Sequence, residues 1–200
     1  MITSCQIYRK LEAMELLQSS PPRWWPGAGT FEVVVGAVLT QNTTWKNVEK
    51  SVLNLEGHLT LESFLSLDEE KLKKYIRPSG FYNQKAPRLI SLAKQIAHDF
   101  HTFERFQTDV SREWLLSQKG VGPETADSIL CYGCFRNEMV VDSYTKRVLS
   151  QYGVVLSDYP QYKTFLENGI KEHCREDINL IFSRFHGMIV EYSKKMKLKA

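Results

Sequence analysis

The stretch SREWLLSQKGVGPETADSILCYG, residues 111–133, carries the clearest local pattern in the chain. Apolar residues around Trp114 favour a short helix, and the segment KGVG that follows favours a tight turn. Pro123 suits the first position of a second helix, because the N–H that proline lacks is not needed there. The stretch therefore predicts a helix, a glycine-bracketed turn and a second helix.

The predicted turn is suited to binding an anion. Glycine permits a positive φ and a close backbone approach. The start of the second helix directs N–H groups and the positive end of the helix dipole outward, where a sugar-phosphate backbone can bind. A plain helix-turn-helix corner has the same appearance, so both interpretations stay open on this stretch alone. The candidate DNA-binding residues of the turn are Lys119, Gly120, Val121 and Gly122.

Length and composition are those of an ordinary globular protein. The chain has 200 residues, of which 42% are hydrophobic and 24% charged, enough for one substantial core or two small lobes. No apolar run reaches the roughly 18 residues that a membrane-spanning helix needs, so no membrane association is expected. The N-terminus lacks the pattern of a secretory signal, which predicts an intracellular protein. A net charge of +3 permits nucleic-acid binding without requiring it.

The spacing of apolar residues is helical along most of the chain. Residues 31–39, 86–97 and 178–192 repeat apolar side chains at intervals of three and four. The apolar runs at 33–35 and 139–141 are short enough to be strand fragments. The pattern predicts an all-α protein with about ten helices and short polar connections.

The cysteines allow two interpretations. Cys131 and Cys134 form a C-x-x-C pair, which is found at zinc and redox sites. No second pair is present, although Cys174 beside His173 could add ligands. Because the pair lies in an apolar helical run, we expect two buried thiols on one helix face.

A carboxylate follows the predicted hairpin at a characteristic distance. In MVVDSYTKRV, residues 139–148, Asp142 comes after an apolar segment and before another helix, 20 residues beyond Gly122. Three further segments accompany it, which are LTQNTTW at 39–45, SGFYNQKA at 79–86 and FHG at 185–187. Together they resemble the helix-hairpin-helix DNA glycosylases of the endonuclease III superfamily, over most of the chain.

The resemblance implies an architecture and a partner. It implies an all-α HhH-GPD fold of two helical lobes flanking a DNA-binding cleft. One lobe would span 27–134, with the hairpin at 111–133, and the other would combine 1–26 with 135–200. Double-stranded DNA would be the partner of a monomeric, cytoplasmic and nucleoid-associated enzyme. Gln41 would enter the gap that a flipped base leaves.

Two departures from the family pattern change the expected chemistry. Glu124 stands where bifunctional members have the lysine that forms a Schiff base, and a carboxylate cannot form an imine. This implies hydrolysis of the N-glycosidic bond without AP lyase activity. No cysteine follows His186, so we expect neither the iron–sulfur cluster of many relatives nor any other cofactor or metal. Gln-Lys at 118–119 replaces the Leu-Pro that is usual in the family's hairpin.

Tryptophans narrow the resemblance further. The segment RWWP at 23–26 and Trp45 are similar to the endonuclease III-like 3-methyladenine DNA glycosylases of bacteria, which implies DNA with N-alkylated purines as substrate. A cationic purine stacks well between electron-rich rings. For each tryptophan ring the alternative role is packing in the core. For Glu124 the alternative is a carboxylate that interacts favourably with the helix dipole in the first turn of its helix. The candidate base-pocket residues are Trp24, Trp25, Pro26, Trp45 and Glu124.

Asp142 is the candidate catalytic residue. An ionised carboxylate can stabilise the oxocarbenium-like sugar and guide water to C1′. The alternative is a helix N-cap, worth about 1 kcal/mol of stability. For Gln41 the alternative is an exposed loop amide. Two other functions stay open, which are a glycosylase for another damaged or mismatched base and a non-catalytic DNA-binding module.

Overall fold

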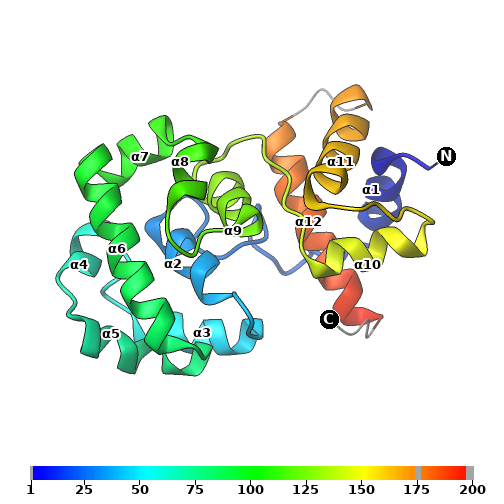
Figure 1. Cartoon of the computed structure of the whole chain (residues 1–200). Helices are drawn as coiled ribbons and strands as arrows, with labels where there is room; N and C mark the ends of the chain where they lie inside the picture. The colour runs from blue at the N-terminus through cyan, green and yellow to red at the C-terminus, as the bar shows by residue number, and fades with distance from the viewer. Residues whose placement is uncertain (1, 174–176, 197–200) are drawn as a thin grey trace. The chain divides into compact units, whose positions relative to one another are not determined.

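The computed structural model describes residues 2–173 and 177–196. Within these ranges the chain forms twelve α-helices and no strand, so the predicted all-α class is confirmed (Figure 1). Residues 33–35 lie inside a helix, and 139–141 run as an extended segment without a partner strand. Cys174 lies outside the described residues.

The helices belong to two compact units. Gly27–Ile129 form one, here called the central unit, and Met1–Pro26 with Leu130–Ala200 form the other, the terminal unit. The predicted boundary assigned 130–134 to the central lobe. These residues belong instead to the terminal unit, because the buried Tyr132 bonds to Ser183 and His186 there.

The central unit is built around an apolar helix, α2 (Phe31–Leu39), which is buried on nearly every side. This helix contacts α3, α6 and α9. The other elements of the unit are α3 (Trp45–Asn54), α4 (Leu61–Leu65), α5 (Glu69–Ile76), the 3-10 turn η1 (Arg77–Ser79), α6 (Tyr82–Phe100), α7 (Phe103–Asp109), α8 (Arg112–Ser117) and α9 (Pro123–Ser128).

The terminal unit packs around α12 (Ile178–Lys195), drawn in orange to red in Figure 1. Helices α1 (Ser4–Glu12), α10 (Ser143–Gln151) and α11 (Tyr159–His173) all contact it. A π-helical turn, η2 (Ile129–Gly133), continues directly from α9.

The two paired cysteines are buried thiols, as the helical spacing predicts. Cys131 and Cys134 lie in and just after η2, and burial raises the pKa of the Cys134 thiol to about 12. Such a thiol is protonated at neutral pH and therefore a poor nucleophile.

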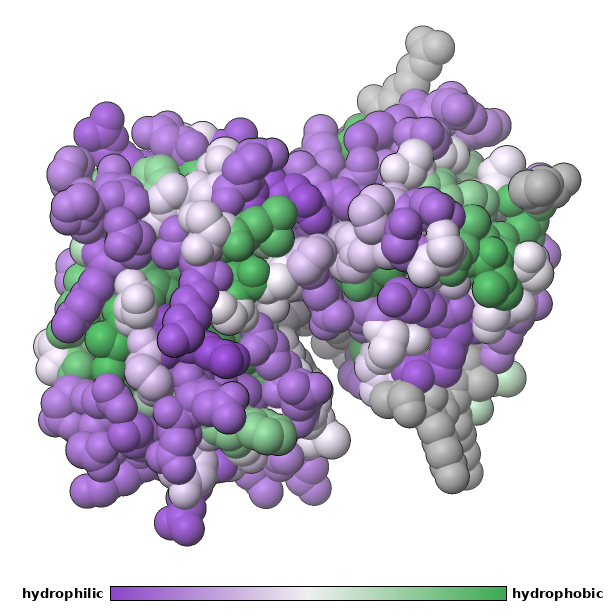
Figure 2. Space-filling view, viewed as in Figure 1, coloured by the Kyte–Doolittle hydropathy of each residue, from purple (hydrophilic) through white to green (hydrophobic). Residues whose placement is uncertain are grey.

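The outer surface has few apolar side chains. Figure 2 shows hydrophobic residues in scattered patches among hydrophilic ones on the face in view. No described helix is long and apolar enough to cross a membrane. The exposed large hydrophobic residues are Met14, Leu53, Phe81, Phe135, Val155 and Met196.

Candidate active site and DNA-binding hairpin

The hairpin of the central unit has the predicted form. Helix α8 ends at Ser117, and α9 begins at Pro123. Gly120 has a φ of +85°, so the position favours glycine, and a Cβ added there would also displace the flexible Arg88 side chain, whose Cδ would lie 2.6 Å away. Val121 is buried and anchors the turn, whereas Lys119, Gly120 and Gly122 are exposed. No side chain caps the start of α9.

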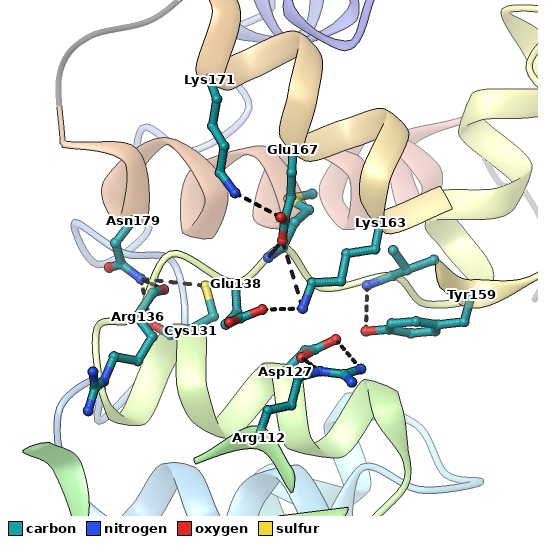
Figure 3. Close-up of polar contacts among 12 residues, drawn as sticks. Arg112, Asp127, Cys131, Arg136, Glu138, Tyr159, Lys163, Glu167, Lys171 and Asn179 are labelled. Carbon is teal, nitrogen blue, oxygen red and sulfur yellow. Dashed lines mark hydrogen bonds and ion pairs between the residues drawn. The ribbon is translucent and has the colours of Figure 1, made fainter. Parts of the chain in front are cut away.

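An ion pair fixes the two hairpin helices to each other. Arg112 on α8 donates from Nε and Nη2 to the carboxylate of Asp127 on α9, at 2.7 and 3.2 Å (Figure 3). Asp127 is fully buried, and the two-point contact is the geometry in which an arginine–carboxylate pair is most specific. The exposed turn between the helices is therefore held on a rigid base.

Gln41 lies against the hairpin. Its Nε2 donates to the Gly120 carbonyl at 2.9 Å and to the Thr125 Oγ1 at 3.0 Å, so both amide hydrogens are used. The amide is thus not a free loop group, and entering a duplex would require both bonds to break. Its role in DNA stays a prediction.

Helix α3 begins at Trp45, one of the candidate pocket residues. Thr44 is the N-cap residue, and its side chain makes no capping hydrogen bond. Trp45 at the first helical position is half-buried and donates from Nε1 to Glu49 at 2.8 Å. Glu124 is exposed in the first turn of α9. The pocket roles of Trp45 and Glu124 stay predictions.

Phe81 belongs to the segment SGFYNQKA, and the amino-acid pattern of that segment alone assigns it no role. It is 58% exposed and has a φ of +49°, in the left-handed region that costs a bulky residue about 1–3 kcal/mol. It directly precedes α6 and follows the turn at Gly80. The feature of the sequence that could have indicated a role for Phe81 is its position directly after a Pro-Ser-Gly turn, because such positions usually hold small or polar residues.

Asp142 in the terminal unit caps α10 and also faces His186. Its Oδ1 accepts hydrogen bonds from the Thr145 backbone N–H at 2.7 Å and from the Thr145 hydroxyl at 2.8 Å, which completes a capping box on α10. The second oxygen, Oδ2, faces the His186 Nε2 at 3.4 Å. The side chain is 14% exposed, so the carboxylate keeps a narrow opening.

Three side chains hold the segment that leads to Asp142. Asn179 donates to the Cys131 and Arg136 carbonyls, at 2.9 and 2.6 Å (Figure 3). The backbone N–H of Met139 donates to Glu167, and that of Val141 donates to the Tyr159 hydroxyl. Residues 136–141 are thereby fastened to α11 and α12 although they form no helix or strand.

His186 lies between Tyr132 and Asp142, with one ring nitrogen near each of them. The His186 Nδ1 lies 2.7 Å from the Tyr132 hydroxyl, which also lies 3.1 Å from the Ser183 carbonyl. When the hydroxyl donates to Nδ1, Nε2 carries the ring hydrogen and faces the Asp142 Oδ2 at 3.4 Å.

These contacts keep Asp142 ionised. Burial alone would raise the pKa of Asp142, but the interactions with His186 and the two bonds from Thr145 outweigh it and hold the pKa below its usual range. Burial raises the pKa of Tyr132 well above 10, so its hydroxyl stays neutral. The site therefore presents a negative charge that is largely shielded from water.

The two neighbouring tryptophans have different surroundings. Trp24 is half-buried, lies edge-on to the His186 ring at 5.4 Å and donates from Nε1 to Glu191. Trp25 is buried against Tyr132 at 5.0 Å, which is the core packing that was its alternative interpretation. Pro26 is exposed. The structure places Trp24 beside the Asp142–His186 pair, and the pocket roles of all three residues stay predictions.

The cysteines do not suit an iron–sulfur cluster. Cys5, Cys131 and Cys134 are buried, and the chain has no cysteine after His186. Within residues 2–173 and 177–196, no three histidine, cysteine or acidic side chains lie close enough to hold a metal ion.

Comparison with known proteins identifies the family. Residues 35–172 match the family described as HhH-GPD superfamily base excision DNA repair protein. A protein of Methanocaldococcus jannaschii, provisionally named a DNA repair glycosylase, is 45% identical over 181 residues, which cover 86% of this chain and 80% of that protein. The chain belongs to the HhH-GPD superfamily. Within it, the protein is a base excision DNA glycosylase.

Solved structures agree with this assignment. The 3-methyladenine DNA glycosylase MagIII of H. pylori, bound to 1,N6-ethenoadenine, has a TM-score of 0.93 and 42% identity, and the match covers all of both chains. A non-covalent endonuclease III–DNA complex has a TM-score of 0.72 at 21% identity, covers 97% of this chain and 87% of that chain, and shares the fold.

Proposed function

We propose that this protein is a monofunctional DNA glycosylase that flips N-alkylated purines, chiefly 3-methyladenine, out of double-stranded DNA and leaves an abasic site. The observation that carries the proposal is Asp142, a nearly buried carboxylate held ionised beside His186. The similarity to a 3-methyladenine glycosylase of H. pylori supports the choice of substrate. The proposed enzyme works as a monomer on nucleoid DNA in the cytoplasm.

The chemistry follows from the charge of the substrate. An N3-alkylated adenine is already cationic, so the C1′–N bond breaks with its electron pair passing to the base, which leaves neutral. The sugar becomes oxocarbenium-like, and the negative charge of Asp142 stabilises it in a site that water screens poorly. Water then bonds to C1′ and releases a proton, which completes hydrolysis.

The residues near the hairpin argue against lyase chemistry. Glu124 has no amine to attack C1′, and Lys119 is exposed in the hairpin turn, where phosphate is its expected partner. We expect borohydride to trap no covalent adduct between the protein and DNA that contains an abasic site. An adduct would contradict the absence of lyase activity.

The central unit supplies the groups that we propose hold and open the duplex. The hairpin turn binds the phosphate backbone through its exposed backbone and Lys119. Phe81 is an exposed apolar side chain of the kind that wedges between base steps. Gln41 fills the gap of the flipped base after it leaves Gly120 and Thr125. The terminal unit carries the proposed base-stacking residues Trp24, Trp25 and Pro26, and the central unit carries the proposed pocket residues Trp45 and Glu124.

One experiment separates the candidate functions. Wild-type protein and Asp142→Asn are incubated with methylated duplex DNA, and the released bases are identified by chromatography. We expect 3-methyladenine from the wild type, and a loss of release by Asp142→Asn of about 100-fold or more without loss of DNA binding. Asparagine also caps helices well, so the fold is retained. Release of an oxidised or mismatched base from DNA that contains it would assign the enzyme a different substrate. Release of no base would favour a non-catalytic DNA-binding module.

A further inference from the structure

Lys85 is a buried amine that the proposed chemistry does not use. It lies on α6, its side chain is 2% exposed, and no carboxylate of the described chain is within ion-pair distance. Its Nζ donates to the carbonyls of Leu39 and Ser79, both at 2.9 Å. These two bonds are its polar contacts in the central unit.

The positive charge of Lys85 does not itself stabilise the fold. Burying a cationic amine without a counter-ion costs free energy, and burial accordingly lowers the pKa of Lys85 to about 8. An apolar side chain of similar length would avoid the cost of burying the charge but would remove the donor that the Leu39 and Ser79 carbonyls share. The lysine therefore provides something other than packing, and the candidates are the two carbonyls that it joins.

The two carbonyls lie at the bases of two loops. Leu39 is the last residue of α2, two residues before Gln41. Ser79 is the last residue of η1, two residues before Phe81. One amine thus bridges the start of the loop that carries Gln41 and the start of the loop that carries Phe81. Ser51 on α3 also bonds to the Ser79 N–H, at 3.1 Å, but does not reach the first loop.

We propose that Lys85 is a positioning residue that fixes the spacing of the two loops which enter the duplex, so that Phe81 and Gln41 act together when the base is flipped. The inference rests on the proposed function. It requires no titration, because a neutral amine keeps two N–H donors, one for each carbonyl. The lysine acts through the backbone and contacts neither the DNA nor the base.

The experiment compares Lys85→Met with a matched control. Methionine keeps a long unbranched side chain but removes both bridging bonds. Ser51→Ala removes a buried bond to the same Ser79 turn and leaves the Lys85 bridge in place, so it controls for loss of stability. The probe is a duplex with 2-aminopurine beside a tetrahydrofuran abasic-site analogue, whose fluorescence rises when the neighbouring base is unstacked. Duplex affinity, 3-methyladenine release and urea unfolding are measured in parallel.

We expect Lys85→Met to lose about tenfold or more in 2-aminopurine unstacking and in base release, because displacements of about 1 Å at such groups have effects of this size. Affinity for an undamaged duplex, which the hairpin provides, changes by less than about twofold. Ser51→Ala keeps unstacking near the wild-type level. The wild-type unstacking signal stays constant between pH 7 and about pH 9, because the two donors remain when the amine loses its proton.

Two results would overturn the proposal, which are wild-type unstacking by Lys85→Met and an equal loss in Ser51→Ala. If Lys85→Met does not fold, Lys85→Gln replaces it, because the glutamine amide ends one atom short and cannot bridge both carbonyls. Normal unstacking by Lys85→Gln would also overturn the proposal. A wild type that unstacks the duplex but releases no alkylated base would overturn the proposed function alone. A wild type that binds without unstacking would overturn both.

Discussion

Replacing His186 by phenylalanine tests whether the histidine acts through Asp142. Phenylalanine keeps a ring against Trp24 and Tyr132, and Tyr132 can still donate to Ser183. At the observed 3.4 Å, a full positive charge on the ring would interact with the carboxylate by about 5 kcal/mol at an effective dielectric constant of 20, and a neutral N–H donor would interact by less. The cost of desolvating both groups reduces this, and we expect a net coupling of about 2 kcal/mol.

A double-mutant cycle measures this coupling. Urea unfolding at pH 7 is compared for the wild type, His186→Phe, Asp142→Asn and the double variant. The single histidine variant strands a carboxylate that only Thr145 still contacts, so it should be destabilised far more in the wild-type background than in the Asp142→Asn background. Additive effects within about 0.5 kcal/mol would refute the reasoning.

His186→Phe should also change the pH dependence of base release. In the wild type the pKa of Asp142 is lowered, so its contribution to stability is present above the unfolded pKa and lost as pH falls through the folded pKa. Without His186, burial dominates and raises the pKa of Asp142. The acid limb of base release should therefore move to higher pH in His186→Phe, and an unmoved limb would contradict the proposed role.

Three further predictions concern the central unit. Gly120→Ala should lower the free energy of unfolding by about 1–3 kcal/mol and weaken duplex binding, because a φ of +85° strains a residue with a Cβ. Gly122→Ala is the control and should unfold like the wild type, because no atom lies within 4 Å of the new Cβ. Phe81→Gly should raise the free energy of unfolding by about 1 kcal/mol, because glycine adopts a φ of +49° without strain. The same variant should unstack 2-aminopurine less than the wild type does, and normal unstacking would exclude Phe81 as the wedge. Between pH 8 and pH 10.5 the wild type should gain up to about 3 kcal/mol of stability relative to Lys85→Met. The pKa of Lys85 is lower in the folded than in the unfolded protein, so the cost of burying the charge disappears as the amine loses its proton. A constant difference in urea unfolding over this range would show that the amine is not buried as a cation.

The local motifs were predictable because neighbouring residues alone determine them. Pro123 begins α9 and Asp142 caps α10, as their positions before apolar helical patterns indicate. The burial of Cys131 and Cys134 follows from the same periodicity. Residue type alone does not determine capping, since Thr44 precedes α3 as its N-cap residue but makes no side-chain capping bond.

What the amino-acid sequence determines by itself is therefore the helical class, the glycine turn between α8 and α9, and the carboxylate that begins α10, because each depends on residues a few positions apart. Tertiary structure alone decides what surrounds these groups. The His186–Tyr132 contact joins residues 54 positions apart, the Lys85–Leu39 bond spans 46 and the Gln41–Gly120 bond spans 79. No periodicity encodes such pairs, since they form only when packed helices bring distant backbone and side-chain atoms within hydrogen-bond distance.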